Sequence, residues 1–165
     1  KQVYASGNQD VNHLNEKYNN KTPDILDNAY VIVDFQNGVR ALLDLCMFAE
    51  NSTNQEELCA VGDIGKIETA VPSASSGKNL SELRIGYRKN GKTLNEIVDV
   101  DEEILKVGNH HGSTYYEHIS FLDSIESSKP AAVSLNDGLQ AVAIGEAAEI
   151  SIKENRIVKM DEFKI

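Results

Sequence analysis

The hydrophobic pattern changes its period once along the chain, and this change limits the fold more than any other feature. Up to about residue 100, apolar and polar side chains alternate, which is typical of strands with one buried face. In the last third, apolar residues recur at helical spacing in two segments. Because strands come first and helices late, the order predicts an α+β domain, with a mainly antiparallel sheet and helices packed on one face.

The stretch AYVIVDFQNGVRALLDLCMF, residues 29–48, predicts a hairpin whose register can be decided. A one-residue slip would move every side chain to the other face of the sheet. A two-residue Asn-Gly loop would set Val31 opposite Asp44, which places a charge on the apolar face. A three-residue Gln-Asn-Gly loop pairs Val31 with Leu43 instead, and puts Gly38 where such a loop needs a left-handed residue. We therefore predict the three-residue loop.

A second hairpin is predicted over residues 81–100, SELRIGYRKNGKTLNEIVDV. Here a two-residue Asn-Gly turn pairs Tyr87 with Leu94 and Ile85 with Glu96. This register leaves one face largely apolar and the other polar, as expected of an antiparallel sheet with one solvated side.

Two further strands, EELCAVG and KIETAV, are predicted between the hairpins and are joined by GDIG, whose glycines suit a tight turn. A phosphate-binding role for Gly62–Gly65 would need a helix after the turn, and no helical pattern follows. The next stretch, PSASSGKN at residues 72–79, is a loop by composition.

Two capping boxes predict the helix starts of the last third. In this device a Ser or Thr and an acidic residue three positions later satisfy free amides of the first turn. Thr114 with Glu117 predicts the first start, and Ser134 with Asp137 predicts the second. The first helix should end at ESSKP, and its apolar stripe turns His118 toward the core. A short strand, RIVKM, is expected after the second helix.

Composition excludes several classes of partner. The chain has 165 residues, enough for one domain with a substantial core. Its net charge of -10, without a Lys or Arg cluster, disfavours nucleic acid, and no apolar run approaches the ~20 residues of a membrane span. Cys46 and Cys59 lie in apolar runs, where we expect small buried side chains and no disulfide framework. With no signal peptide, these features predict a soluble, cytoplasmic protein.

Polar groups with catalytic or metal-binding potential gather in GNHHGSTYYEH, residues 108–118. Zinc-binding helices typically present two histidines at i and i+4, and that spacing is missing. Glu117 is already assigned to the capping box, so we expect no metal. A G-x-S-x-G nucleophile elbow, a G-x-G-x-x-G dinucleotide fingerprint and a P-loop are also missing. Local chemistry alone therefore identifies no catalytic centre.

Several stretches follow one another in a distinctive order. DNAYVIVDFQNGVRALL and CAVGDIGKIETAVP come first, then HHGSTYYEH, then FLDSI followed by a proline and VSLNDGL, and finally EAAEISIKENRIV. In this order and spacing they resemble the C-terminal domain of the Gfo/Idh/MocA oxidoreductases, the relatives of glucose-fructose oxidoreductase, inositol dehydrogenase and MocA. The resemblance extends from Val3 to Phe163, nearly the whole chain.

The resemblance implies a division of labour between two domains. Family members have an N-terminal Rossmann domain that binds NAD or NADP and holds a catalytic lysine, and an Asp/His pair that should lie just before Lys1. The second domain closes over the nicotinamide and makes subunit contacts through its sheet. By this resemblance, residues 1–165 form a single C-terminal domain for substrate placement and homo-oligomerisation, in a longer dehydrogenase acting on a sugar, cyclitol or related polyol. Because the cofactor would be bound mainly by the absent domain, we expect this fragment alone to bind none and to be inactive.

Substrate placement is what this domain could add to such an enzyme. The candidate contacts are His110, His111, Tyr115 and Tyr116, which are hydrogen-bonding side chains at a loop-to-helix junction. The alternative for these residues is structural, with Tyr115 in the core and the histidines solvated near the helix start. No catalytic, cofactor-binding or metal-binding residue is expected within the chain itself.

Two other hypotheses compete with the dehydrogenase domain. One is a stand-alone, non-catalytic module that binds a sugar or a partner protein. The other is a structural domain whose sheet dimerises through the outer face of the 29–48 hairpin, where Ile32 and Leu42 lie beside polar residues.

Overall fold

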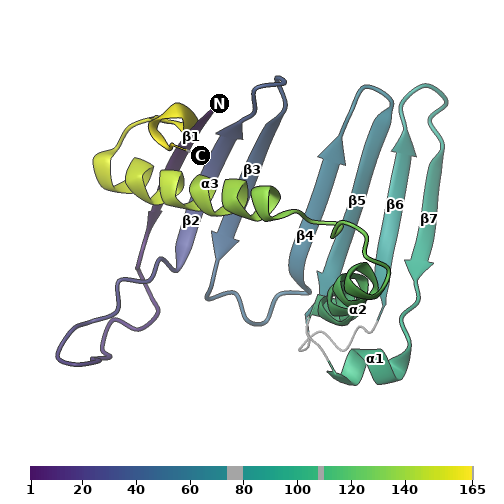
Figure 1. Ribbon diagram of the computed structural model, residues 1–165, viewed down its shortest axis with the longest axis horizontal. Coiled ribbons are helices and arrows are strands. Elements are labelled where there is room, and N and C mark those ends of the chain that lie inside the picture. Colours follow the sequence, from purple (N-terminus) through teal and green to yellow (C-terminus); the bar gives the residue numbers. More distant parts are fainter. Residues whose placement is uncertain (74–79, 108–109, 165) are drawn as a thin grey trace. The chain divides into compact units, whose positions relative to one another are not determined.

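The strands form two separate four-stranded antiparallel sheets, each in its own compact unit of the chain (Figure 1). The computed structural model describes residues 1–73, 80–107 and 110–164. One unit combines Lys1–Ala49 with Val133–Ile165, and the other is the continuous segment Glu50–Ala132. The antiparallel sheets and the helices that accompany them confirm the predicted α+β class.

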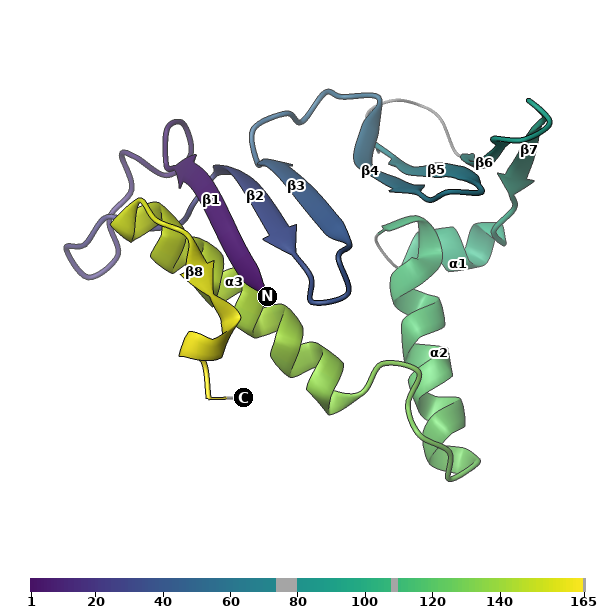
Figure 2. The ribbon, with the colours of Figure 1, turned by 90° about the horizontal axis from the view of Figure 1, so that it is seen from above.

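The first sheet brings both ends of the chain together. Its strand order is β3-β2-β1-β8, so the last strand lies beside the first (Figure 2). The strands are β1 (Gln2–Asn8), β2 (Asn28–Asp34), β3 (Arg40–Cys46) and β8 (Val158–Lys159). β8 is shorter than the predicted RIVKM strand because a 3-10 helix, Met160–Glu162, follows it directly.

The hairpin of β2 and β3 has the predicted three-residue loop. Val31 is paired with Leu43 and Asp34 with Arg40. Gly38 has a φ of 88°, the left-handed conformation that this loop requires. The register prediction is therefore confirmed.

The core of the first unit lies between this sheet and α3 (Leu135–Glu154), which covers one sheet face (Figure 1). The helix contributes small buried side chains, which let its backbone approach the strands closely. They are Ala143, Ala147, Ala148 and Ser151. The strands contribute Val3, Ala5, Ala29, Val31, Val33 and Val158. The predicted capping box is confirmed, since Ser134 Oγ accepts the Asp137 N–H at 3.1 Å and the Asp137 carboxylate accepts the Ser134 N–H at 2.9 Å.

The second sheet has the order β4-β5-β6-β7. Its strands are β4 (Asn54–Val61), β5 (Gly65–Pro72), β6 (Ser81–Tyr87) and β7 (Thr93–Val98). The predicted turn between β4 and β5 is confirmed, because the Gly62 N–H donates to the Gly65 carbonyl at 2.8 Å. Residues 74–79 of the predicted 72–79 loop lie outside the described residues.

The predicted register between β6 and β7 is wrong by two residues. Ile85 is paired with Leu94 rather than with Glu96, and the Tyr87 N–H donates to the Lys92 carbonyl at 2.8 Å. The loop therefore holds four residues instead of two, and the Lys92 N–H donates to Asn90 Oδ1 at 3.0 Å within it. A shift of two keeps every side chain on its predicted face.

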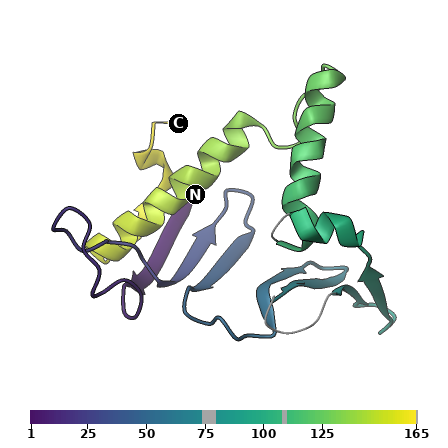
Figure 3. The same cartoon turned by 90° about the horizontal axis from the view of Figure 1, so that it is seen from below.

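Three helical segments follow β7 in the second unit. They are α1 (Glu102–Val107), which the sequence pattern did not predict, a short 3-10 helix (His110–Gly112) and α2 (Ser113–Glu126). α1 and α2 run in different directions, with the 3-10 segment between them (Figure 3). α2 ends near ESSKP as predicted, with Ser128 in the left-handed region at φ 53° and the Lys129 N–H donating to the Ser124 carbonyl at 3.0 Å.

The long β1–β2 connection, residues 9–27, is fixed at its base by Asp27, which is 1% exposed. The carboxylate accepts the backbone N–H groups of Asp10, Val11 and Asn12 at 2.7 to 3.1 Å, and the Asn28 side-chain amide at 2.9 Å. Burial by itself raises the pKa of Asp27, but these donors together outweigh it and bring the pKa down to about 2.

The predicted burial of the two cysteines is wrong. Cys46 and Cys59 are both exposed and unpaired. They lie on β3 and β4, each of which is the edge strand of its sheet, where a side chain lacks neighbours on one side. Among the described residues, no helix is both long and apolar enough to cross a membrane.

Candidate functional site

The predicted site residues lie at the corner where α1 gives way to α2. Three consecutive residues there have left-handed backbones: His110 at φ 56°, His111 at φ 53° and Gly112 at φ 84°. α2 therefore begins at Ser113, and its N-cap is Gly112, without a side-chain cap. The predicted capping box of Thr114 and Glu117 is wrong, because Thr114 already lies inside the first helical turn.

Tight packing at Gly112 holds this corner in place. Gly112 is buried, and a Cβ built on it would lie 3.0 Å from Val100 Cγ1 and 3.1 Å from Ile104 Cγ2. Its positive φ also disfavours any side chain. In addition, Ser113 Oγ donates to the His110 carbonyl at 2.8 Å. α1 and the start of α2 thus fix the histidine backbone from both sides, as expected where a strained conformation persists.

His110 is bonded to a residue that is distant in the sequence. Its Nδ1 lies 2.6 Å from Oε1 of Glu56 on β4. The side chains are 43% and 44% exposed, so the pair remains open to solvent and to ligands. The sequence contains no signal for this contact, because the two residues are 54 positions apart and Glu56 belongs to no recognised motif.

His111 presents an unsatisfied polar atom. Its side chain is partly buried, and Nε2 is shielded from solvent without a hydrogen-bond partner among the described residues. Leaving such an atom unpaired costs about 1–3 kcal/mol. A ligand hydroxyl could satisfy this nitrogen once a rearrangement of the corner exposes it.

Tyr115 and Tyr116 form an edge-to-face pair, with ring centroids 5.8 Å apart and planes at 79°. They are 37% and 48% exposed, so the alternative that Tyr115 belongs to the core is wrong. The Tyr116 ring leans back toward the corner, with Cε2 3.9 Å from the position of a Cβ on Gly112. His118 is also exposed, which makes its predicted packing wrong.

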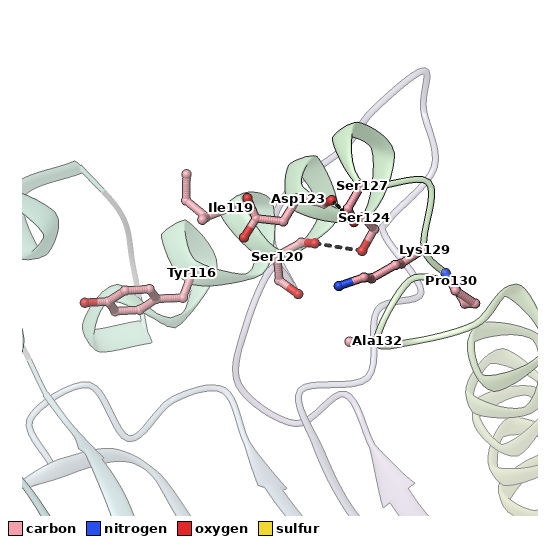
Figure 4. Close-up of a pocket in the computed structure, with 9 residues that line it drawn as sticks. All are labelled: Tyr116, Ile119, Ser120, Asp123, Ser124, Ser127, Lys129, Pro130 and Ala132. Atoms are coloured by element: carbon pink, nitrogen blue, oxygen red, sulfur yellow. Dashed lines mark hydrogen bonds between the residues drawn. The ribbon is translucent and has the colours of Figure 1, made fainter.

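Tyr116 also stands at one end of a shallow hollow along α2, with a volume of about 380 Å³ (Figure 4). Lys129 extends across the hollow from the turn that follows the helix. Ser124 and Ser127 donate their hydroxyls to carbonyls of the helix itself, Ser120 O at 2.8 Å and Asp123 O at 2.6 Å. The sequence did not predict this hollow, because the polar residues that line it are equally typical of a solvated helix face.

The Gly62–Gly65 turn does not fit the phosphates of a dinucleotide. Such a site uses a glycine-rich turn that opens a helix, whereas the Gly62–Gly65 turn leads into β5. Across residues 1–73, 80–107 and 110–164, no three His, Cys, Asp or Glu side chains are placed to hold a metal ion.

The sequence profile described as "Oxidoreductase family, C-terminal alpha/beta domain" matches residues 1–160. The chain belongs to the Gfo/Idh/MocA oxidoreductase family. This confirms the resemblance inferred from the motif order, and it places the whole of the described corner inside the family's C-terminal domain. No curated protein sequence is significantly similar to this chain.

Solved structures with the same fold include other Gfo/Idh/MocA dehydrogenases. An oxidoreductase from Agrobacterium radiobacter, in complex with NAD⁺, L-tartaric acid and magnesium, is 21% identical with a TM-score of 0.66, over 98% of this chain and 43% of that one. Levoglucosan dehydrogenase, in complex with NADH and levoglucosan, is 17% identical with a TM-score of 0.69. The match covers 98% of this chain and 45% of that one. The WlbA dehydrogenase from Bordetella pertussis, in complex with NADH and UDP-GlcNAcA, is 12% identical with a TM-score of 0.57. The match covers 95% of this chain and 41% of that one. The chain thus spans less than half the length of each.

Proposed function

We propose that this chain is the substrate-side and oligomerisation domain of an NAD(P)-dependent oxidoreductase that acts on a sugar, cyclitol or related polyol. Family membership over residues 1–160 supports the reaction class. The ligands of similar structures support the substrate class, since they include levoglucosan and L-sorbose. In this proposal residues 1–165 act as one domain of a longer enzyme, and NAD or NADP is bound mainly outside them.

The substrate contacts in this proposal are His110, His111, Tyr115 and Tyr116. The unpaired Nε2 of His111 is the observation that carries the assignment, because a substrate hydroxyl that enters as the corner rearranges would complete its hydrogen bonding. His110 and the two phenol groups are exposed at the same corner and offer further donors and acceptors. A cluster of imidazole and phenol groups suits a polyol, because a polyol is rich in hydroxyls that can donate to them and accept from them.

The oligomerisation role is assigned to the outer face of the first sheet. Tyr4, Ile32 and Leu42 are cross-strand neighbours there and are 41%, 47% and 68% exposed. A row of apolar side chains at the centre of an open sheet face is a surface suited to a second copy of the chain. We also propose a cytoplasmic location, because two exposed and unpaired cysteines fit a reducing compartment.

The test uses the full-length polypeptide that carries this chain. Formation of NADH or NADPH is followed with a panel of sugars and polyols, including myo-inositol, levoglucosan and L-sorbose. We expect turnover with at least one member of the panel. His111→Ala should raise KM for that substrate about tenfold, equivalent to the loss of about 1.4 kcal/mol of binding. His118→Ala, an exposed residue of α2, should leave KM within about twofold.

Two outcomes would contradict the proposal. Tight NADH binding by residues 1–165 alone would show that the cofactor site is not mainly elsewhere. Polyol binding by the full-length protein without any reduction of NAD⁺ or NADP⁺ would favour the non-catalytic binding module instead.

A further inference from the structure

We propose that Glu56 is a positioning residue for His110, and that the pair selects uncharged polyols over sugar acids. This inference rests on the proposed function, because it assigns a role to a residue of the same site. The carboxylate would accept the Nδ1–H of the imidazole. The opposite ring nitrogen, Nε2, is then left as an acceptor for a substrate hydroxyl.

The geometry of the pair supports a fixed ring tautomer. A neutral imidazole carries its proton on one nitrogen, and a hydrogen bond to that nitrogen decides which one. His110 Nδ1 lies 2.6 Å from Glu56 Oε1, the short distance of a charge-assisted hydrogen bond. A carboxylate can only accept, so a neutral His110 must place its proton on Nδ1 to make this bond.

The two partners come from elements that are themselves held in place. Glu56 is part of the β4–β5 ladder, where it is paired with Val71. His110 belongs to the left-handed segment that Gly112 and Ser113 fix at the corner. Because each backbone belongs to a hydrogen-bonded segment, the contact joins two built parts of the unit.

The charge of the pair favours one class of ligand. With its proton on Nδ1, His110 offers an unshared electron pair at Nε2, which attracts a hydroxyl proton and repels a carboxylate. The Glu56 charge adds to this repulsion at short range. A polyol therefore satisfies the site, whereas the corresponding sugar acid brings a second negative charge beside Glu56.

The chain provides a matched control for Glu56. Glu57 is the next residue on the same strand, so its side chain lies on the opposite face of the sheet. It is also exposed and is also hydrogen-bonded, to Asn54 Nδ2 at 2.7 Å. Glu57→Ala removes the same charge from the same strand without touching His110.

The first experiment measures the ring tautomer directly. Imidazole ¹⁵N shifts of residues 1–165 would be recorded at pH 8, with the His110 signals assigned from a His110→Gln variant. We expect the Nδ1–H form in the native chain and in Glu57→Ala. Glu56→Ala should shift the ring toward the Nε2–H form, and Glu56→Gln, which keeps an acceptor, should largely retain Nδ1–H. An Nε2–H ring or a doubly protonated ring in the native chain would overturn the positioning role.

The second experiment measures selectivity in the full-length enzyme. With the best polyol from the panel, Glu56→Ala should raise KM about 3- to 10-fold while kcat changes less, as expected for one lost hydrogen bond. Inhibition constants would be measured for the polyol and for a sugar acid, such as L-tartrate. In Glu56→Gln, the sugar acid should bind more nearly as well as the polyol does. An unchanged KM and an unchanged ratio of these constants would overturn the selective role. If no polyol is oxidised, the proposed function fails, and the tautomer measurement still decides the pairing of Glu56 and His110.

Discussion

Asp27 shows how one buried carboxylate can organise a long loop. Residues 9–27 contain little regular structure of their own, and a connection of this length needs anchoring to adopt one conformation. Three consecutive backbone N–H groups, those of Asp10, Val11 and Asn12, converge on the carboxylate. Together they act on the anion as the N–H groups of a backbone nest do.

We expect Asp27→Asn to lower the melting temperature by roughly 5 °C, because an amide presents an NH₂ group to donors that need an acceptor. Differential scanning fluorimetry would measure the change. The native pKa of about 2 lies below the ordinary 3.8, so the carboxylate contributes stability above about pH 4 and loses it as the pH falls toward 2. The variant should show a flatter stability profile over that range. Asp24→Asn, exposed in the same loop, should behave like the native protein.

Gly112 carries a second prediction at the scale of single residues. Gly112→Ala should destabilise the second unit by about 2 kcal/mol, because the methyl group meets Val100 and Ile104 and the backbone has a φ of 84°. Gly145→Ala on α3 is the control, since the added methyl group meets nothing within 4 Å beyond its own stretch of helix backbone. That change should instead stabilise the protein by ~1 kcal/mol through helix propensity. Urea unfolding would compare them, and equal effects would contradict the packing account.

At the scale of elements, Ser151 joins α3 to β1 where the sheet is incomplete. β8 pairs only with Gln2 and Val3, so it does not reach the Ala5 N–H. Ser151, which is 0% exposed, accepts that N–H at 2.9 Å and donates to the Arg156 carbonyl at 2.6 Å. A helix hydroxyl thus takes the place of a missing strand residue.

Ser151→Ala should cost about 1–3 kcal/mol, because it leaves a buried N–H and a carbonyl without this partner. The midpoint of urea unfolding, at constant slope, is the measurement. Ser124→Ala is a suitable comparison, since that exposed hydroxyl bonds only to a carbonyl of its own helix, and its removal should change stability by less than about 0.5 kcal/mol. Similar losses at the two sites would mean that the Ala5 bond contributes little.

The two hairpins show what the sequence pattern can and cannot decide. In the first, the alternative loop differed by one residue and would have set Val31 opposite Asp44, so polarity selected the observed register. In the second, the registers differed by two residues, and both leave Ile85 and Leu94 on the same face. Alternation has a period of two and carries no information about such a shift. The turn geometry decided it instead, through contacts that the pattern does not encode.

The sequence predicted that the candidate residues lie near a helix start, but it did not predict their local structure. The motif HHGSTYYEH located its histidines and tyrosines near a helix start. However, the left-handed run from His110 to Gly112 depends on packing against Val100 and Ile104, and this packing requires the unpredicted helix α1. Glu56 reaches the site only through the folding of β4. These are tertiary effects, for which a single sequence offers no local signal.

At the scale of the whole molecule, self-association tests the outer face of the first sheet. Ile32 lies between Tyr4 and Leu42 in the exposed apolar row. If the native protein self-associates through this face, Ile32→Lys should make it monomeric, because a desolvated charge would be buried at the centre of the contact. Size-exclusion chromatography with light scattering would show the change. Val39→Lys, at the exposed hairpin turn, should leave the mass unchanged, and a monomeric native protein would rule out this interface.

The chain order of the first unit has a consequence for biosynthesis, because its helix α3 is made long after the strands that it covers. Within this domain, β1 to β3 are synthesised before the other elements, but α3, which covers their apolar face, follows only after all of Glu50–Ala132 has been made. At about 5–20 residues per second, that interval lasts several seconds. The second unit, Glu50–Ala132, can complete its fold during this time, while one face of the first sheet is still uncovered. A nascent chain at this stage is the form that we expect to need a chaperone, and synthesis of α3 ends that need.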